Sequence, residues 1–336
     1  MPIKFAAIGL NHSHIYGQVN CLLREGAELV AFHSPEDDLA AEFSAKYPQV
    51  KRVADQRAIL EDPTIALVMT AAILSERAAI SIAAMRHGKD VMSDKPGMTS
   101  LEQLAEIKRA QVETGRIYSV CYSEHFETRS TVKAGELVKA GAIGQVINTV
   151  GLGPHAIRNN QRPEWFFDRQ LYGGILCDIG SHQFEQFLTY TGAKDATVAS
   201  AAVGNFANPS TPELEDFGEA TLIGDNGSTN MIRVDWFTPA GLSTWGDGRT
   251  FILGTKGYVE LRKYVDVARA RGGEHVFVVD DKGEHSLNVR GKVGYRFFGD
   301  FILDCLNRTE KAMTQEHAFK AGELCVKAQA AARWLT

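Results

Sequence analysis

Apolar residues in the first third of the chain form short continuous runs, separated by segments in which they recur at helical spacing. The runs that we expect to be strands are Ile3–Ile8, Glu28–Phe32, Ile65–Met69, Asp90–Met92 and Ile117–Cys121. Such continuous runs are typical of strands that are buried on both faces. The expected helices between them include Asp37–Tyr47, Ser75–His87 and Leu101–Thr114. Strands that alternate with helices predict a doubly wound parallel sheet, an α/β domain that we place at residues 1–121.

The pattern changes after Cys121. Helices are expected around Val132–Ala140 and His182–Tyr190, and beyond Gly192 the chain becomes rich in strands. Residues 231–236 alternate as in a half-buried strand, and turn residues occur at 225–228, 254–257 and 281–283. We therefore predict a second, α+β domain at residues 122–336, with a large, mainly antiparallel open sheet and a C-terminal helix. The exposed face of such a sheet favours a homodimer or homotetramer.

Composition argues against some partners. The 336 residues suit two domains, and 36 basic against 41 acidic residues give a net charge of −5. Because no basic run stands out, neither nucleic acid nor an anionic membrane is an expected partner. The five cysteines form no CxxC pair, so we expect reduced, buried thiols. No charged leader and no apolar stretch of ~20 residues stands in the sequence, which predicts a cytoplasmic protein.

The turn after the first strand is a candidate site. A strand, a glycine turn and a helix together offer free N–H groups and a partial positive charge to a dinucleotide pyrophosphate. The usual spacing is G-x-G-x-x-G, whereas this chain has Gly9-Leu10-Asn11-His12-Ser13-His14. Asn11 tolerates a positive φ and can replace the second glycine, while His14 stands in place of the third.

Three interpretations of this turn remain open. Asn11, His12 and Ser13 can donate hydrogen bonds to phosphates, or Ser13 can simply cap the helix. His12 and His14 can also be metal ligands, although no local cysteine or aspartate cluster supports a metal site. About twenty residues further on, where an acidic residue normally binds the ribose, the chain has His33-Ser34. Acidic residues 36–38 follow and would repel a 2′-phosphate, which favours NAD over NADP.

Two further segments carry candidate chemistry. Lys95 follows the strand at Asp90–Met92, at the edge of the sheet where α/β proteins bind ligands. Gly173-Gly174 precede Asp178 and His182, which are four residues apart at an expected helix start and so could face one way. An imidazole oriented by a carboxylate is the usual general base near neutral pH. Each residue also has an ordinary alternative, as a surface lysine, an N-cap aspartate or a core histidine.

Together these segments resemble the Gfo/Idh/MocA oxidoreductase family, which includes glucose–fructose oxidoreductase and inositol 2-dehydrogenase. Asp94-Lys95-Pro96 is similar to the family's Glu-Lys-Pro motif, and residues 173–182 match its G-G-x-x-x-D-x-G-x-H motif. Residues 140–144, Ala-Gly-Ala-Ile-Gly, match the segment that usually precedes the first strand of its second sheet. The resemblance covers essentially the whole chain and implies an N-terminal Rossmann domain that binds NAD or NADP.

The resemblance also implies roles for individual residues. Lys95 would hold the reacting hydroxyl and help to place the nicotinamide, His182 would accept the hydroxyl proton, and Asp178 would orient His182 or relay the proton. The expected cofactor-binding residues are Gly9, Asn11, His12, Ser13, His14, His33, Ser34, Ala72 and Lys95. The expected substrate-binding residues, which offer stacking surfaces and hydrogen-bond donors suited to a sugar, are Tyr122, His155, Arg162 and Trp165. No metal ligand is expected.

Three segments depart from the family pattern. The glycine turn is altered, Thr-Pro-Asn-x-x-His is replaced by Ala-Ile-Leu-Ser-Glu-Arg at residues 72–77, and Asn-Arg-Arg is replaced by Ser123-Glu124-His125. The expected activity is the NAD(P)-dependent interconversion of a secondary alcohol and a ketone on a sugar, cyclitol or related polyol. Two alternatives remain. One is a carbohydrate-cleaving enzyme that oxidises its substrate transiently with tightly held NAD, and the other is a cofactor- or ligand-binding protein without turnover.

Overall fold

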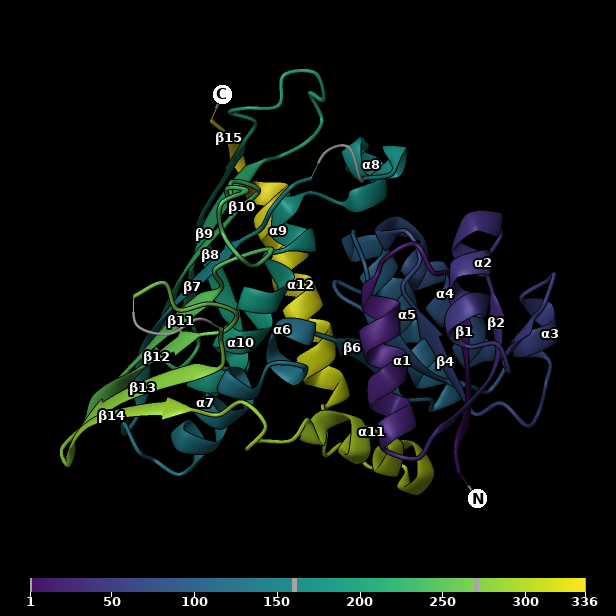
Figure 1. The fold of residues 1–336 in the computed structure, drawn as a ribbon, viewed down its shortest axis with the longest axis horizontal. Helices are drawn as coiled ribbons and strands as arrows, with labels where there is room; N and C mark the ends of the chain where they lie inside the picture. Colours follow the sequence, from purple (N-terminus) through teal and green to yellow (C-terminus); the bar gives the residue numbers. More distant parts are fainter. Residues whose placement is uncertain (1, 159–161, 269–271, 336) are drawn as a thin grey trace. The chain divides into compact units, whose positions relative to one another are not determined.

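The computed structural model describes residues 2–158, 162–268 and 272–335. The chain forms two compact units, Met1–Ser123 with Arg296–Phe319, and Glu124–Tyr295 with Lys320–Thr336. Figure 1 gives the order of the elements along the chain. The first unit thus takes in a segment from near the C-terminus, which the expected division after residue 121 does not include.

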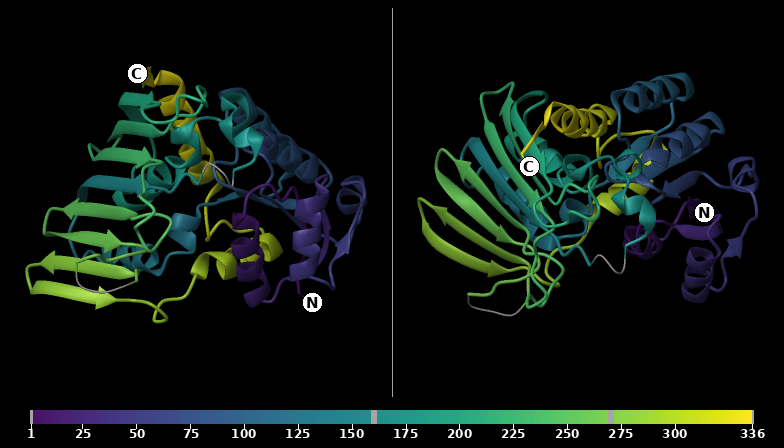
Figure 2. Two further views of the ribbon diagram at one scale, coloured as in Figure 1. Left: turned by 45° about the horizontal axis from the view of Figure 1, so that its top comes forward. Right: turned by 90° about the horizontal axis from the view of Figure 1, so that it is seen from above.

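The first unit contains a six-stranded sheet in which all strands are parallel. In the order in which they lie, the strands are β3 (Lys51–Arg52), β2 (Glu28–His33), β1 (Lys4–Ile8), β4 (Leu67–Thr70), β5 (Asp90–Asp94) and β6 (Tyr118–Cys121). The helices between them are α1 (His14–Arg24), α2 (Asp37–Lys46), α3 (Arg57–Leu60), the 3₁₀ helix η1 (Leu74–Glu76), α4 (Arg77–Arg86) and α5 (Leu101–Thr114). Because the strand order reverses direction at β1, helices lie on both faces of the sheet (Figure 2). The predicted doubly wound parallel sheet is confirmed.

The C-terminal segment of this unit consists of α11 (Arg296–Asn307) and the start of α12 (Gln315–Ala331). After α11, Arg308 forms an ion pair of 2.6 Å with buried Asp90, the first residue of β5. The side chain of Gln315 bonds both the N–H and the carbonyl of Tyr118 in β6. These bonds tie the segment to one side of the sheet, although it is far from both strands in sequence.

The second unit contains a nine-stranded sheet, in which the neighbours are antiparallel except for the pairs β7–β10 and β8–β15. In the order in which they lie, the strands are β14 (Gly283–Asn288), β13 (His275–Asp280), β12 (Gly257–Arg262), β11 (Arg249–Gly254), β7 (Val146–Pro154), β10 (Thr229–Asp235), β9 (Phe217–Gly224), β8 (Ala196–Gly204) and β15 (Arg333–Trp334). The predicted turns connect β9 to β10, β11 to β12 and β13 to β14. The expected large, mainly antiparallel sheet is therefore confirmed.

Helices cover one face of this sheet, whereas the opposite face carries none in Figure 2. They include α7 on β12, α9 on β9 and α10 on β7. The helices of this part of the chain are α6 (Ser123–Phe126), α7 (Arg129–Lys139), η3 (Glu164–Phe167), α8 (Arg169–Tyr172), α9 (Ile175–Asp178) and α10 (Ser181–Thr191). None of the helices in the described chain is long and apolar enough to cross a membrane. The five cysteines are all buried and unbridged, as expected.

Candidate active site

The predicted cofactor-binding residues lie at the carboxyl ends of the parallel strands of the first sheet. These ends lie along one edge of the sheet, so β1 leads to residues 9–14, β2 to residues 33–34, β4 to Ala72 and β5 to Lys95. Gly9 has a φ of +80°, and a Cβ at this position would lie 2.4 Å from the Cβ of Ala72. Only glycine therefore lets the ends of β1 and β4 come this close.

His12, rather than Ser13, caps the start of α1. The Nδ1 atom of His12 accepts a hydrogen bond from the backbone N–H of His14 at 3.2 Å, whereas Ser13 makes no capping bond through its side chain. Burial and the neighbouring His14 lower the pKa of His12 well below its ordinary value, against the opposing effect of Asp94. A neutral ring that accepts at Nδ1 carries its proton on Nε2. The Ser13 cap is thus wrong, and His12 has an Nε2–H group that can donate to a phosphate.

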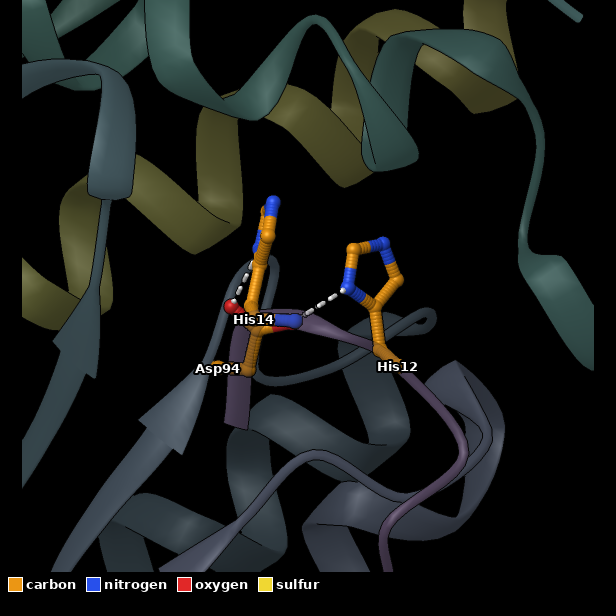
Figure 3. A group of neighbouring side chains, drawn as sticks. All are labelled: His12, His14 and Asp94. Atoms are coloured by element: carbon orange, nitrogen blue, oxygen red, sulfur yellow. Dashed lines mark hydrogen bonds and ion pairs between the residues drawn. The ribbon is translucent and has the colours of Figure 1, made fainter. Parts of the chain in front are cut away.

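The carboxylate of Asp94 is the centre of a buried polar cluster (Figure 3). Its Oδ1 atom accepts a hydrogen bond from Gln18 at 2.7 Å and lies 3.0 Å from Nδ1 of His14. Its Oδ2 atom lies 3.2 Å from a guanidinium nitrogen of Arg77. Burial alone would raise the pKa of Asp94, but His14, Arg77 and His12 hold it well below the usual range. Asp94 is therefore an anion that ties α1 and α4 to the end of β5.

Arg77 fixes the backbone on both sides of this cluster. Its Nε donates to the carbonyl of Ala72 at 2.8 Å, and its Nη1 donates to the carbonyl of Lys95. Lys95 itself is buried, with a cis peptide bond to Pro96, so the surface-lysine interpretation is wrong. Arg77 was not among the predicted site residues, although an arginine at the start of the alanine-rich helix α4 is a signal for one.

His12, His14 and Asp94 also bring three potential metal-ligand atoms within 4.8 Å of one another. The sequence showed no aspartate beside the two histidines because Asp94 arrives from β5. The carboxylate already faces Arg77, and Nδ1 of His12 is already an acceptor for the His14 N–H. A metal ion bound to this carboxylate would lie next to the Arg77 guanidinium, so the electrostatics of the cluster disfavour it.

Asn11 and Ser34 meet at the carboxylate of Glu36, one of the three acidic residues at 36–38 that the sequence places after the second strand. Asn11 donates to Oε1 of Glu36 at 2.7 Å, and Ser34 donates to Oε2 at 2.6 Å. Burial alone would raise the pKa of Glu36, but these two hydrogen bonds lower it below the ordinary value. His33 instead bonds the carbonyl of Val53 through Nδ1. Glu36 is therefore the acidic residue after β2, where such a residue normally binds the ribose.

In the second unit, Asp178 and His182 lie on two helices rather than at the start of one. Asp178 is the last residue of α9 and His182 is the second of α10. The chain turns between them at Gly180, where a Cβ would lie 2.5 Å from the carbonyl oxygen of Leu176. Both side chains are buried. The N-cap alternative for Asp178 is wrong, because this residue ends a helix instead of starting one.

Glu124 places a buried carboxylate beside His182. Glu124 accepts hydrogen bonds from Lys263 at 2.7 Å and from Gln183 at 3.1 Å. Its Oε1 atom lies 3.9 Å from Nε2 of His155. Burial alone would raise the pKa of Glu124, but Lys263, His182 and His155 lower it to about 2. Glu124 is therefore ionised at neutral pH and acts electrostatically on the His182 ring.

Two of the predicted substrate residues, His155 and Arg162, share one aromatic ring. The His155 ring lies 5.4 Å from the ring of Trp236, and the Arg162 guanidinium lies 4.9 Å from the centre of the same ring. Burial lowers the pKa of Arg162, against the opposing effect of Asp178, so the guanidinium and this carboxylate are neighbours. His155 also contacts Trp245 at 4.4 Å. Neither tryptophan was selected from the sequence, because both come from a distant part of the chain.

Trp165 reaches this group through one intervening ring, whereas Tyr122 lies in the other unit. The ring of Trp165 packs edge-on against Phe166, with the ring centres 6.0 Å apart, and the Phe166 ring in turn lies 4.4 Å from the Arg162 guanidinium. Tyr122 belongs to the first unit, where it is buried directly after β6. The structure therefore groups His155 and Arg162 with Asp178, and it gives Trp165 a packing contact.

Each of the two units contains a region that matches a known family model. Residues 3–122 match a model described as the oxidoreductase family, NAD-binding Rossmann fold, and residues 131–260 match the GFO/IDH/MocA C-terminal domain. The chain belongs to the Gfo/Idh/MocA oxidoreductase family. The family resemblance found in the motifs is therefore confirmed. The expectations of an NAD(P)-dependent dehydrogenase and of an N-terminal Rossmann domain are confirmed as well.

Individual relatives span nearly the whole chain. A crystallised oxidoreductase candidate from Erwinia carotovora atroseptica SCRI1043 is 47% identical, covers 99% of this chain and 100% of its own, and superposes with a TM-score of 0.97. The scyllo-inositol 2-dehydrogenase (NAD(+)) of Bacillus subtilis (strain 168) is 25% identical over 288 residues, 83% of this chain and 80% of its own length. The myo-inositol 2-dehydrogenase of Lactobacillus plantarum is 19% identical, with a TM-score of 0.79 over 99% of this chain and 97% of its own, and shares the fold.

Two ion pairs with both side chains buried, one in each unit, were not foreseen from the sequence. One joins Arg77 to Asp94 in the first unit, and the other joins Lys263 to Glu124 in the second. Glu124 stands in a segment that departs from the family pattern, which was the one signal available, and its partner is 139 positions away. The second pair places the Glu124 carboxylate near the His182 imidazole, and a nearby carboxylate favours the protonated form of an imidazole.

Proposed function

We propose that this enzyme oxidises a secondary alcohol of a sugar, cyclitol or related polyol to a ketone with NAD, and catalyses the reverse reaction with NADH. The observation that carries the proposal is the buried His182 imidazole next to Glu124, which has a pKa of about 2. An ionised carboxylate raises the basicity of a neighbouring imidazole. Relatives named as inositol and xylose dehydrogenases support a polyol as the substrate.

In this proposal the chain's own residues move one proton. Lys95 donates a hydrogen bond to the reacting hydroxyl, and His182 accepts its proton while bound NAD supplies the hydride acceptor. Asp178 orients His182 or relays the proton. The Arg162 guanidinium is a charged neighbour of the Asp178 carboxylate. General-base assistance of this kind typically contributes ~10²–10⁴ in rate.

The residues at the edge of the first sheet fit a dinucleotide with a free ribose 2′-hydroxyl. The N-terminus of α1 follows β1 directly, and the Nε2–H of His12 adds a donor for the pyrophosphate. The Glu36 carboxylate, held by Asn11 and Ser34, can accept a hydrogen bond from a ribose hydroxyl. The same carboxylate would repel a 2′-phosphate. We therefore favour NAD over NADP.

The open face of the nine-stranded sheet supports assembly into a homodimer or homotetramer. Met231 and Phe251 are both in register with Val150, so they flank β7 on one face, and both are exposed. Other exposed apolar side chains, on β7, β9, β11 and β12 of the same sheet, are Ile147, Ile223, Leu253 and Tyr258. An apolar patch of this kind is typical of an interface. Sedimentation of the protein with Met231→Glu and Phe251→Glu should show a smaller assembly than the unchanged protein does.

Calorimetric titration with NAD, NADH, NADP and NADPH, after a check for cofactor carried through purification, tests the proposal first. Tighter binding of the NAD pair, followed by NADH formation with a sugar or cyclitol, is the expected result. Absence of both binding and carried cofactor would contradict it and favour a binding protein without turnover. Substrate cleavage without net NADH formation would favour the carbohydrate-cleaving alternative.

A further inference from the structure

The second unit contains a pocket of about 700 Å³ next to the Glu124–Lys263 pair. Lys263 lines this pocket and donates to the carboxylate that acts on His182. The volume falls within the range of roughly 300–1,000 Å³ that is common for small-molecule sites. The pocket is therefore large enough for a substrate and lies beside the proposed chemistry.

Two cations of the pocket already have carboxylate partners. Lys263 is paired with Glu124 at 2.7 Å. Arg129 lies 3.8 Å from Glu274, which also accepts a hydrogen bond from the N–H of Ser130. These two pairs leave no negative charge for any other cation in the pocket.

Arg158 and Arg290 also line the pocket. Across residues 2–158, 162–268 and 272–335, neither guanidinium has a carboxylate within ion-pair distance. Outside the pocket lining, Arg158 also helps to lower the pKa of Arg162, after the larger effect of burial and against the opposing effect of Asp178, so no counter-charge comes to Arg158 from that side. The pocket thus carries about two uncompensated positive charges in a chain whose net charge is −5. An anionic ligand would offset these charges.

Aromatic rings form another part of the pocket wall. Trp245 and Tyr264 both line it, with their ring centres 4.4 Å apart. The His155 ring lies 4.4 Å from that of Trp245, and His155 in turn lies 3.9 Å from Glu124. A tryptophan face suits the C–H face of a sugar ring. The pocket therefore joins a stacking surface to two free arginines.

We propose that the substrate is an anionic polyol, whose carboxylate or phosphate group binds Arg158 and Arg290 while its carbon skeleton stacks on Trp245. This inference deepens the proposed function and rests on it. A sugar acid and a sugar phosphate share the required chemistry, and the experiment below separates them.

Matched substrates test the charge requirement directly. NADH formation is compared for D-glucose, D-gluconate, D-glucuronate and D-glucose 6-phosphate, and for myo-inositol and its 1-phosphate. A charged hydrogen bond changes affinity by ~10- to 100-fold, so an anionic member should exceed its neutral parent in kcat/KM by at least about tenfold. Preference for the acids or for the phosphates identifies the group. A neutral parent that equals or exceeds its anionic derivatives overturns the inference while leaving the proposed function intact.

Variants assign the effect to the pocket. Arg158→Gln and Arg290→Gln should each raise KM for the anionic substrate by ~10-fold or more, with little change in kcat or in KM for the neutral parent. Arg333→Gln, on β15 at the opposite edge of the sheet, is the matched control and should change neither. Equal losses with both substrates would mean that the arginines are structural.

If NAD binds but no compound in the set is oxidised, inorganic phosphate is the probe. Calorimetry should then show phosphate binding that is lost in the Arg158→Gln, Arg290→Gln double variant and kept in Arg333→Gln. No phosphate binding, or binding that the double variant retains, overturns the inference. Failure of the proposed function appears separately, as the absence of NAD binding.

Discussion

The ammonium group of Lys263 donates a hydrogen bond of 2.7 Å to the carboxylate of Glu124, and both side chains are buried. Taking two charges out of water is costly, so such a pair is seldom retained for stability alone. Here the carboxylate also lies in the electrostatic range of His182 and His155. Its position favours a role in setting the basicity of His182, with Lys263 offsetting the cost of the buried charge.

Glu124→Gln should separate the contribution of this ion pair to stability from its contribution to the basicity of His182. It leaves the Lys263 ammonium buried without a counter-charge, which typically costs ~3–5 kcal/mol of unfolding free energy. It should also lower kcat/KM and shift its acid limb to lower pH, because the His182 imidazole loses the nearby negative charge. Urea denaturation and a pH–rate profile measure both effects. The Glu124→Gln, Lys263→Met double variant should regain much of the stability but not the turnover, and recovery of turnover would make the pair purely structural.

Glu124 also makes stability depend on pH. Its pKa in the folded protein is about 2, below its ordinary value of 4.5. A depressed carboxylate pKa stabilises the fold fully above the unfolded value, and that stabilisation is lost as the pH falls from about 4.5 towards 2. The difference corresponds to roughly 3 kcal/mol. Urea unfolding over this interval should show a steeper loss for the unchanged protein than for Glu124→Gln, and equal slopes would contradict the low pKa.

The fold could be predicted because its signals are local. Continuous apolar runs marked β1, β2, β4, β5 and β6, and the helix expected at Leu101–Thr114 has those bounds, with Gly115 in a left-handed conformation at its end. The inclusion of α11 in the first unit could not be predicted in this way. It depends on Arg308 reaching Asp90 across 218 positions, and nothing in either segment alone indicates that pairing.

The residues of the candidate site also fall into two groups, those marked by local motifs and those that depend on distant partners. Lys95, Asp178 and His182 stand in motifs that are readable from neighbouring residues, and the structure places all three at ends of secondary structure. Glu124 and Arg77 matter through partners elsewhere in the chain, so their importance appears only when the chain is folded. The break between α9 and α10 was also missed, because the spacing of four residues suits one helix as well as two.

His182→Ala should lower turnover strongly without preventing cofactor binding. Loss of a general base lowers kcat by ~10²–10⁴, whereas the NAD dissociation constant should stay within about twofold. Stopped-flow or steady-state assays and calorimetry give the two values. His285→Ala, at an exposed position in β14, is the matched control. Parallel loss of turnover and NAD binding would mean that His182 supports the fold instead of the reaction.

His12 should contribute to cofactor binding through Nε2–H and to the stability of α1 through Nδ1. His12→Ala removes the Nε2–H donor and the cap at Nδ1, so NAD affinity should fall by ~10-fold and the unfolding free energy by ~1 kcal/mol. His12→Asn can still cap the helix but is too short to replace the ring, so stability should return while affinity stays low. His87→Ala, just after α4, is the control. Normal affinity in His12→Ala would remove His12 from the cofactor site.

Gly9→Ala and Gly26→Ala test how tightly the ends of β1 and β4 are packed. The two glycines have similar φ angles, +80° and +86°, so an alanine at either position bears a similar left-handed strain. They differ in surroundings, because a Cβ at Gly9 would lie 2.4 Å from the Cβ of Ala72, whereas nothing lies within 4 Å at Gly26. Gly9→Ala should therefore lower the unfolding free energy by ~1–3 kcal/mol more than Gly26→Ala does. Adding Ala72→Gly should recover part of that difference, since it removes the atom that the new methyl group meets, and equal costs for the two single variants would mean that these strand ends are not packed together.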